Sequence, residues 1–211
     1  MKTNPNRTAR VGAVLLAAGE SRRMQGPNKL LMEVGGVALV RRSLAALREA
    51  GAEPVVVVLG HAAEQVAPLV QGQGARIVLN ADAAAGQQGS VLAGLRALEL
   101  DEGSILVGLG DQPLLDAADI VAAIDAFAGR RAGAIQVPWH AGQRGNPVVL
   151  DASLRRRVLE EAGSGGLRAF IDAHPELVVR WEAPNDHFTF DLDTADDLAR
   201  LQARLASDAR R

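Results

Sequence analysis

Short apolar runs alternate along this chain with stretches in which apolar side chains recur every three or four residues. The runs at 11–17, 55–59, 75–79 and 105–109 have the length of strands, and the second reads Val-Val-Val-Val-Leu. The helical spacing predicts helices over 39–50, 62–70, 90–98 and 116–127. Strands that are apolar on both faces and separated by helices are typical of a parallel sheet covered on both sides. We therefore expect an α/β fold with three layers, a mostly parallel Rossmann-like sheet between two helical layers.

The pattern changes after Gly129. Strands are expected at 134–137, 147–150 and 177–181, a loop at 138–146, and helices at 153–162 and 167–173. Thr194 and Asp197 have the spacing of a capping box, which predicts a last helix carrying Leu198, Leu201 and Leu205 inward. With no repeat or linker in the sequence, we expect a flexible leader over 1–10 and one domain over 11–206, with halves 11–128 and 129–206.

Composition narrows the possible functions. The chain has 211 residues, no cysteine, no tyrosine and only 3% aromatic residues, so thiolate chemistry, cysteine-ligated metal and aromatic platforms for single-stranded nucleic acid are excluded. A net charge of −2 gives no general attraction to nucleic acid or to membrane surfaces. The basic residues before the first apolar run suggest a secretory signal, but that run is short and interrupted by Gly12. We expect a cytoplasmic protein without nucleic-acid or membrane partners.

The loop after the first expected strand carries the first candidate site. It combines small residues with two arginines and a lysine, and small side chains let backbone N–H groups approach phosphate oxygens. It is neither a P-loop nor a G-x-G-x-x-G fingerprint. The alternative is a surface turn with a solvated basic cluster. The candidate nucleotide-binding residues here are Leu16, Ala17, Ala18, Gly19, Ser21, Arg22 and Lys29, and Arg23 and Lys29 would supply catalytic positive charge.

Acidic residues form the second candidate site. Asp111 follows the strand at 105–109, at the sheet edge where ligands bind in such folds, and Mg²⁺ needs few protein carboxylates when it binds a triphosphate. Asp191 and Asp193 lie two residues apart on an extended stretch, so both point the same way. Ordinary turn chemistry explains Asp111 equally well, and an acidic helix start is the alternative for the other two. We expect Asp111, Asp191 and Asp193 to be Mg²⁺ ligands.

Taken together, these motifs resemble one family. Leu-Ala-Ala-Gly-x-Ser-x-Arg-Met at 16–24, Gly-Asp-Gln-Pro at 110–113 and Asp-x-Asp-Thr at 191–194 resemble the molybdenum cofactor cytidylyltransferases. That family belongs to the nucleotidyltransferase superfamily and is similar to molybdopterin-guanine dinucleotide synthases. The resemblance implies the fold of nucleotide-diphospho-sugar transferases, CTP as donor, Mg²⁺ as cofactor, an anionic pterin as acceptor and a molybdoenzyme client. Ala17-Ala18-Gly19 resembles the cytidylyl form of the motif.

The resemblance also implies roles for further residues. Asn80 and Ser90 would contact the base and ribose, although turn and N-cap chemistry predicts the same residue types. The segments 139–147 and 163–168 would line the acceptor pocket, although Asn146 stands where the family usually has His. The candidate acceptor-binding residues are Gln112, Arg144, Asn146, Gly165, Gly166 and Arg168.

The expected reaction is a Mg²⁺-dependent transfer of CMP from CTP to the terminal phosphate of molybdopterin, with release of pyrophosphate. It needs no covalent nucleophile, and Arg23, Lys29 and Asp111 would be its catalytic residues. Three alternatives stay open. They are a guanylyl or sugar-phosphate transferase of the same superfamily, a noncatalytic carrier of the cofactor, and a structural subunit with a decayed site.

Overall fold

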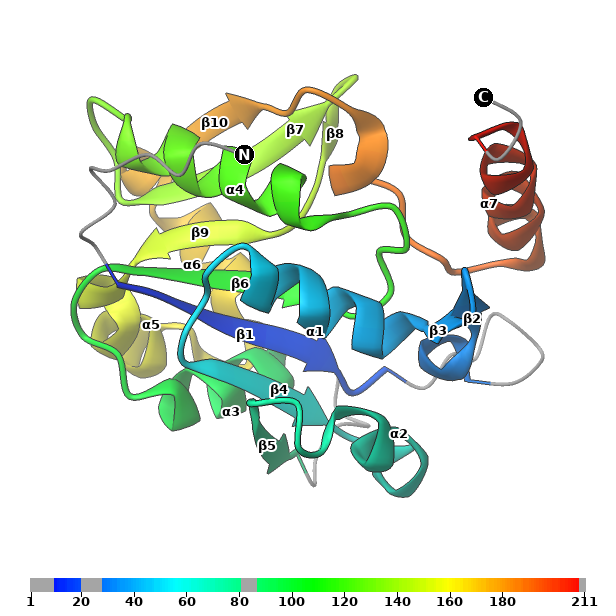
Figure 1. Ribbon diagram of the computed structural model, residues 1–211. Helices are drawn as coiled ribbons and strands as arrows, with labels where there is room; N and C mark the ends of the chain where they lie inside the picture. Colours follow the sequence, from blue (N-terminus) through cyan, green and yellow to red (C-terminus); the bar gives the residue numbers. More distant parts are fainter. Residues whose placement is uncertain (1–9, 20–27, 81–86, 209–211) are drawn as a thin grey trace.

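A mixed sheet of eight strands forms the centre of the molecule (Figure 1). The computed structural model describes residues 10–19, 28–80 and 87–208. The sheet order is β10-β7-β9-β6-β1-β4-β5, with β8 paired to β7. Only β9 and β8 run antiparallel to their neighbours among the described strands of this sheet. The strands are β1 Val11–Ala17, β4 Val55–Leu59, β5 Arg76–Leu79, β6 Ser104–Leu109, β7 Ile135–His140, β8 Gln143–Arg144, β9 Val148–Asp151 and β10 Val178–Glu182.

Helices cover both faces of this sheet (Figure 1). On one face α1 packs against α2 and α4, and on the other α3 packs against α5 and α6. Helix α7 stands beyond the end of the sheet, beside the hairpin of β2, Glu33–Val34, and β3, Val37–Ala38. The helices are α1 Leu39–Glu49, α2 Ala63–Val70, α3 Gln87–Leu98, α4 Ala117–Ala128, α5 Arg155–Glu161, α6 Gly166–Ala173 and α7 Ala195–Asp208. The expected three-layer α/β fold is confirmed.

Side-chain alternation along β1 divides the interior into two cores. Ala13 and Leu15 face the core beneath α1 and α4, whereas Val14 and Leu16 face the core beneath α3, α5 and α6. Successive strand residues point to opposite faces, so a strand covered on both sides must be apolar at every position. All seven residues of β1 and all five of β4 are buried.

The strand order creates a crevice at the end of β1. From β1 the chain proceeds outward to β4 and β5, and β6 then returns to the opposite side of β1. Loops that leave neighbouring parallel strands in opposite directions open a crevice at their carboxyl ends, where ligands bind in such folds. Gly19 follows β1 and Asp111 follows β6, so both lie at this crevice.

Several local predictions were wrong. The expected loop at 138–146 is in large part a strand hairpin, because Trp139 in β7 pairs with Arg144 in β8, and His140 with Gln143. Leu205 is 38% exposed and does not face the core, in contrast to Leu201. The hairpin of β2 Glu33–Val34 and β3 Val37–Ala38 was not predicted at all, because strands of two residues leave no periodicity.

The capping box of the last helix is confirmed. The backbone N–H of Thr194 donates to Asp197, and that of Asp197 donates to the Thr194 hydroxyl. None of the helices in the described part of the chain has the length and apolar composition needed to traverse a bilayer.

Candidate active site

Lys29 lies at the centre of the candidate site. Its Nζ is 2.6 Å from Asp111 Oδ2 and 2.6 Å from Asp193 Oδ1. The residue is only 7% exposed. Segments that are far apart in the sequence therefore meet at one ammonium group, at the crevice beside β1.

Local hydrogen bonds place each of these groups. Asn28 accepts from the backbone N–H of Leu30 and so begins the short 3₁₀ turn η2, Lys29–Leu31. On the β6 side, the N–H of Gly110 donates to the carbonyl of Leu16 at 2.9 Å and joins the ends of β6 and β1. The backbone of Leu192 donates to the carbonyl of Asp111 at 2.9 Å, which fixes the segment before α7 against the end of β6.

The charged groups of this cluster shift one another's pKa values. Burial lowers the pKa of Lys29, but the charges and hydrogen bonds of Asp111 and Asp193 outweigh it and raise that pKa above its ordinary value. Burial, together with the neighbouring charges of Asp111 and Asp193, raises the pKa of Asp191 to about 7. Three carboxyl groups around one lysine leave an excess of negative charge, which favours a further cation.

Two carboxylate oxygens fit a metal ion. Asp111 Oδ1 and Asp191 Oδ1 are buried and have no hydrogen-bond partner. A buried oxygen without a partner is costly, and hard oxygen donors suit Mg²⁺. In the described part of the chain no three carboxyl or imidazole groups are arranged to enclose an ion by themselves. Mg²⁺ on a triphosphate does not require this, because phosphate oxygens and water complete its coordination.

A pocket of about 230 Å³ lies between the sheet and α3 and α6. Three of the predicted acceptor-binding residues, Arg144, Asn146 and Arg168, line it together with Leu16. Arg144 and Arg168 both approach the carboxylate of Asp172, at 3.3 and 3.9 Å. The other lining residues are largely aliphatic, namely Gln88, Val91, Val107, Leu109, Gly145, Val148, Leu167 and Ile171.

The other predicted acceptor residues do not line this pocket. Gln112 is 2% exposed and its Nε2 donates to the carbonyl of Phe188 at 2.9 Å. Gly166 has a φ of 60°, and a Cβ there would lie 2.8 Å from that of Gln88, so its glycine is explained by close packing on α3. Gly165 precedes it in the 3₁₀ turn η5, Gly163–Gly165.

The predicted nucleotide-binding residues fall into two groups within the part of the chain that the structure describes. Asn80 follows β5, and its Nδ2 donates to the hydroxyl of Ser90 in α3 at 3.0 Å. Ala17 and Ala18 are buried, whereas Gly19 is exposed at the end of the described segment. Ser21, Arg22 and Arg23 lie outside the described residues.

Sequence reasoning missed Phe188 and Asp172. Phe188 acts through its backbone carbonyl, which accepts from Gln112 and also from the N–H of Asn146 at 2.9 Å. Any residue type can accept a hydrogen bond through its backbone carbonyl, so no sequence motif indicates this role of Phe188. Asp172 lies one turn after Arg168 on α6, and the spacing i, i+4 was the available signal.

Comparisons with known proteins agree on the superfamily. Residues 13–178 match the model of the MobA-like NTP transferase domain. Nicotine blue oxidoreductase from Paenarthrobacter nicotinovorans is 32% identical over 90% of this chain and 96% of that protein. Bifunctional protein GlmU from Chromohalobacter salexigens is 36% identical over 70% of this chain, but only 32% of that protein is covered.

Solved structures are similar over nearly the whole chain. A nucleotidyl transferase from Methanothermobacter superposes with a TM-score of 0.80 at 24% identity, covering 94% of this chain and 99% of that one. A homologue of Rv0371c from Mycobacterium sp. strain JC1 has a TM-score of 0.73 at 31% identity, with coverage of 94% and 98%. Rv0371c from Mycobacterium tuberculosis in complex with manganese has a TM-score of 0.69 at 25% identity, with coverage of 92% and 98%.

Proposed function

We propose a function from the family of this chain and from the geometry of its site. The chain belongs to the MobA-like NTP transferase domain family. Within that family of nucleotidyltransferases, we infer that it transfers CMP from CTP to the terminal phosphate of the molybdenum-bearing pterin and releases pyrophosphate. The inferred product is a dinucleotide form of the cofactor for a molybdoenzyme client.

One observation carries the proposal. Lys29 lies 2.6 Å from the carboxylates of both Asp111 and Asp193, at the carboxyl edge of the sheet. A buried cation between two acids, beside two unpartnered carboxylate oxygens, supports the binding of a metal ion together with a polyphosphate.

The mechanism follows from charge. The acceptor phosphate and the α-phosphate repel each other, so the enzyme must hold them together and neutralise the charge of the departing pyrophosphate. Lys29 would supply fixed positive charge, with Arg23 as a second cation. Asp111, together with Asp191 or Asp193, would hold Mg²⁺, which when bound offsets negative charge on the phosphate groups.

The composition of the pocket supports an acceptor that carries a phosphate group. Most of the side chains that form the pocket wall are aliphatic, whereas Arg144 and Arg168 are cationic. The two arginines suit the phosphate group of either a pterin or a sugar acceptor. Our choice of a pterin acceptor therefore rests on the resemblance of the sequence motifs.

Donor choice rests on the loop after β1 and the region around Asn80. Ala17-Ala18-Gly19 resembles the cytidylyl form, and Asn80 and Ser90 are our candidates for contacts to base and ribose. We propose CTP as donor and Leu16 to Gly19, Ser21, Arg22 and Lys29 as its binding loop.

The test combines binding with turnover. We expect CTP with Mg²⁺ to raise the melting temperature more than GTP, ATP or UTP, and a pterin phosphate to trigger pyrophosphate release from CTP. Equal shifts for all four nucleotides would contradict the choice of CTP. Tight pterin binding without pyrophosphate release would instead indicate a carrier, and reduction of nicotine blue without nucleotide transfer would indicate an oxidoreductase.

A further inference from the structure

The carbonyl of Phe188 joins two predicted acceptor residues. It accepts from Gln112 Nε2 and from the backbone N–H of Asn146, both at 2.9 Å. The neighbouring Gly145 packs so closely that a Cβ there would lie 2.2 Å from the same oxygen. Because Gly145 and Asn146 line the pocket, the position of this carbonyl determines the position of that part of the pocket wall.

Phe188 belongs to a short 3₁₀ turn, η7 Asp186–Phe188, which is held by a buried acid of α4. Asp119 Oδ2 lies 2.7 Å from His187 Nδ1, and Asp119 Oδ1 accepts from Asn185 Nδ2 at 2.8 Å. Asn185 in turn accepts from the backbone N–H of His187 at 3.1 Å. Asp119 is 7% exposed, and its one carboxylate binds both Asn185 and His187.

The same carboxylate also fixes the start of α4. Asp119 Oδ2 accepts from the N–H of Asp116, and Asp116 accepts from the N–H of Asp119 at 2.9 Å, which completes a capping box. Helix α4 follows the segment that carries Asp111 and Gln112. The chain therefore connects the end of β6 to α4, and hydrogen bonds of Asp119 connect α4 to η7. The bond from Gln112 to the Phe188 carbonyl connects η7 back to the end of β6.

We propose that Asp119 and His187 are positioning residues that fix the Phe188 carbonyl and thereby hold Asn146 in place at the acceptor pocket. The acceptor named for that pocket rests on the proposed function. An ionised carboxylate has no proton to donate, so the proposal places the proton of this pair on Nδ1 of His187, which donates to Asp119. The proposed role requires only a hydrogen-bond donor at Nδ1 of His187, and His187 transfers no proton to the substrate.

The test uses His187→Ala and His187→Asn in the full chain. The amide of Asn occupies the position of Nδ1 and retains the donor, but it cannot titrate. The experiment measures the hydrogen-exchange rate of the Asn146 amide relative to that of the Leu15 amide, which lies in the buried strand β1. We expect exchange at Asn146 to accelerate at least about tenfold relative to Leu15 in His187→Ala, as for the loss of one hydrogen bond, and to return to the wild-type rate in His187→Asn.

Binding supplies a second readout. A pterin monophosphate should bind roughly tenfold more weakly to His187→Ala and normally to His187→Asn, while the affinity for CTP with Mg²⁺ stays unchanged. His174→Ala is the matched control, because His174 also pairs with carboxylates, but with Glu161 and Glu176. It should leave both readouts unchanged.

Each outcome has a defined meaning. Unchanged exchange at Asn146 in His187→Ala would overturn the proposal, and so would a His187→Asn variant that fails as His187→Ala does while remaining folded. If wild-type protein does not bind the pterin phosphate, the proposed acceptor fails, and the exchange experiment still decides whether His187 positions Asn146.

Discussion

Lys29 is a buried cation, and its burial needs an explanation. A lysine that is 7% exposed loses its hydration, and two carboxylates at 2.6 Å compensate for that loss. A lysine with a purely structural role could occupy such a place. However, two unpartnered carboxylate oxygens lie beside it, which a purely structural ion pair leaves unexplained.

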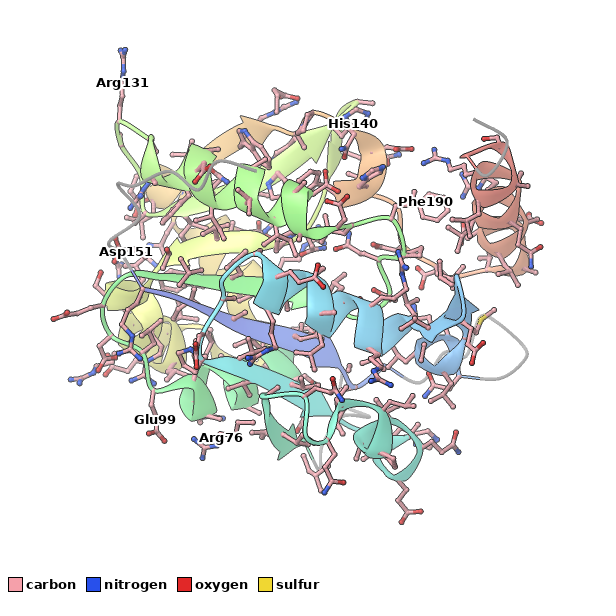
Figure 2. The ribbon with its side chains drawn as sticks, viewed as in Figure 1. Arg76, Glu99, Arg131, His140, Asp151 and Phe190 are labelled. Atoms are coloured by element: carbon pink, nitrogen blue, oxygen red, sulfur yellow. The ribbon has the colours of Figure 1, made fainter. Side chains whose placement is uncertain are left out.

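Replacing Lys29 by Met tests its role in turnover. We expect the rate of pyrophosphate release to fall about 10²- to 10³-fold, the usual loss when one group that stabilises transition-state charge is removed. Circular dichroism would confirm that the variant is folded. Arg76→Met is the matched control, because Arg76 forms an exposed pair with Glu99 at the other end of the strands (Figure 2). Equal rates for both variants would remove Lys29 from the mechanism.

The raised pKa of Asp191 predicts how the free energy of unfolding of the metal-free protein depends on pH. Its pKa of about 7 lies above the ordinary value of 3.8, so the folded state binds more protons than the unfolded state between these values. Stability then decreases as the pH rises from about 4 to 7. Asp191→Asn removes this decrease. The free energy of unfolding of the variant minus that of the wild type should therefore be larger at pH 8 than at pH 5, by at least about 1 kcal/mol.

Chemical denaturation at the two pH values in EDTA measures this difference. Asp125→Asn serves as the control, because Asp125 lies on the exposed side of α4. A variant as sensitive to pH as the wild type would show that Asp191 ionises normally in the folded protein.

At the scale of elements, α7 matters because Asp193 immediately precedes its cap. The helix is held by a small cluster in which Leu201 packs with Val34 and Phe190, and Leu114 covers it. Phe190 projects toward α7 (Figure 2). The guanidinium groups of Arg200 and Arg204 lie over its ring. Few apolar contacts hold this helix, so its docking is sensitive to single substitutions.

Leu201 and Leu205 form a matched pair on α7, one turn apart. Leu201 is 1% exposed and Leu205 is 38% exposed. Leu201→Ala should reduce the stability of α7 docking by about 2–3 kcal/mol, because it leaves a cavity beside Phe190, whereas Leu205→Ala should change it by less than about 0.5 kcal/mol. Hydrogen exchange along α7 measures both. Similar exchange in the two variants would mean that this cluster does not hold the helix.

The sequence predicted most elements but not all of their connections. The runs at 11–17 and 55–59 coincide with β1 and β4, because a strand buried on both faces is apolar throughout. It also predicted that the loop after β1 and Asp111 after β6 lie at one edge of the sheet, since the carboxyl ends of parallel strands meet there. The β7–β8 hairpin was missed because β8 consists of only two residues, both polar. The Phe188 carbonyl was missed because backbone bonds leave no trace in residue type.

At the scale of the whole molecule, one sheet joins the two expected halves of the chain. β9 pairs antiparallel with β6 of the first half, from Ser104 with Asp151 to Val107 with Val148. Val149 and Leu106 lie in the core beneath α1 and α4, and Leu150 and Ile105 in the core beneath α3. Neither core is complete without residues from both halves, so neither half is expected to unfold alone.

This arrangement predicts a single cooperative unfolding transition. Both tryptophans, Trp139 and Trp181, lie in β7 and β10 of the second half, so their fluorescence reports on that half alone. Far-ultraviolet circular dichroism reports on helices of both halves. The two urea transitions should coincide and shift together when CTP and Mg²⁺ are added, because a ligand that binds only the folded state stabilises every part that unfolds with it. Separate midpoints would divide the chain into two folding units and would place the boundary between β6 and β9.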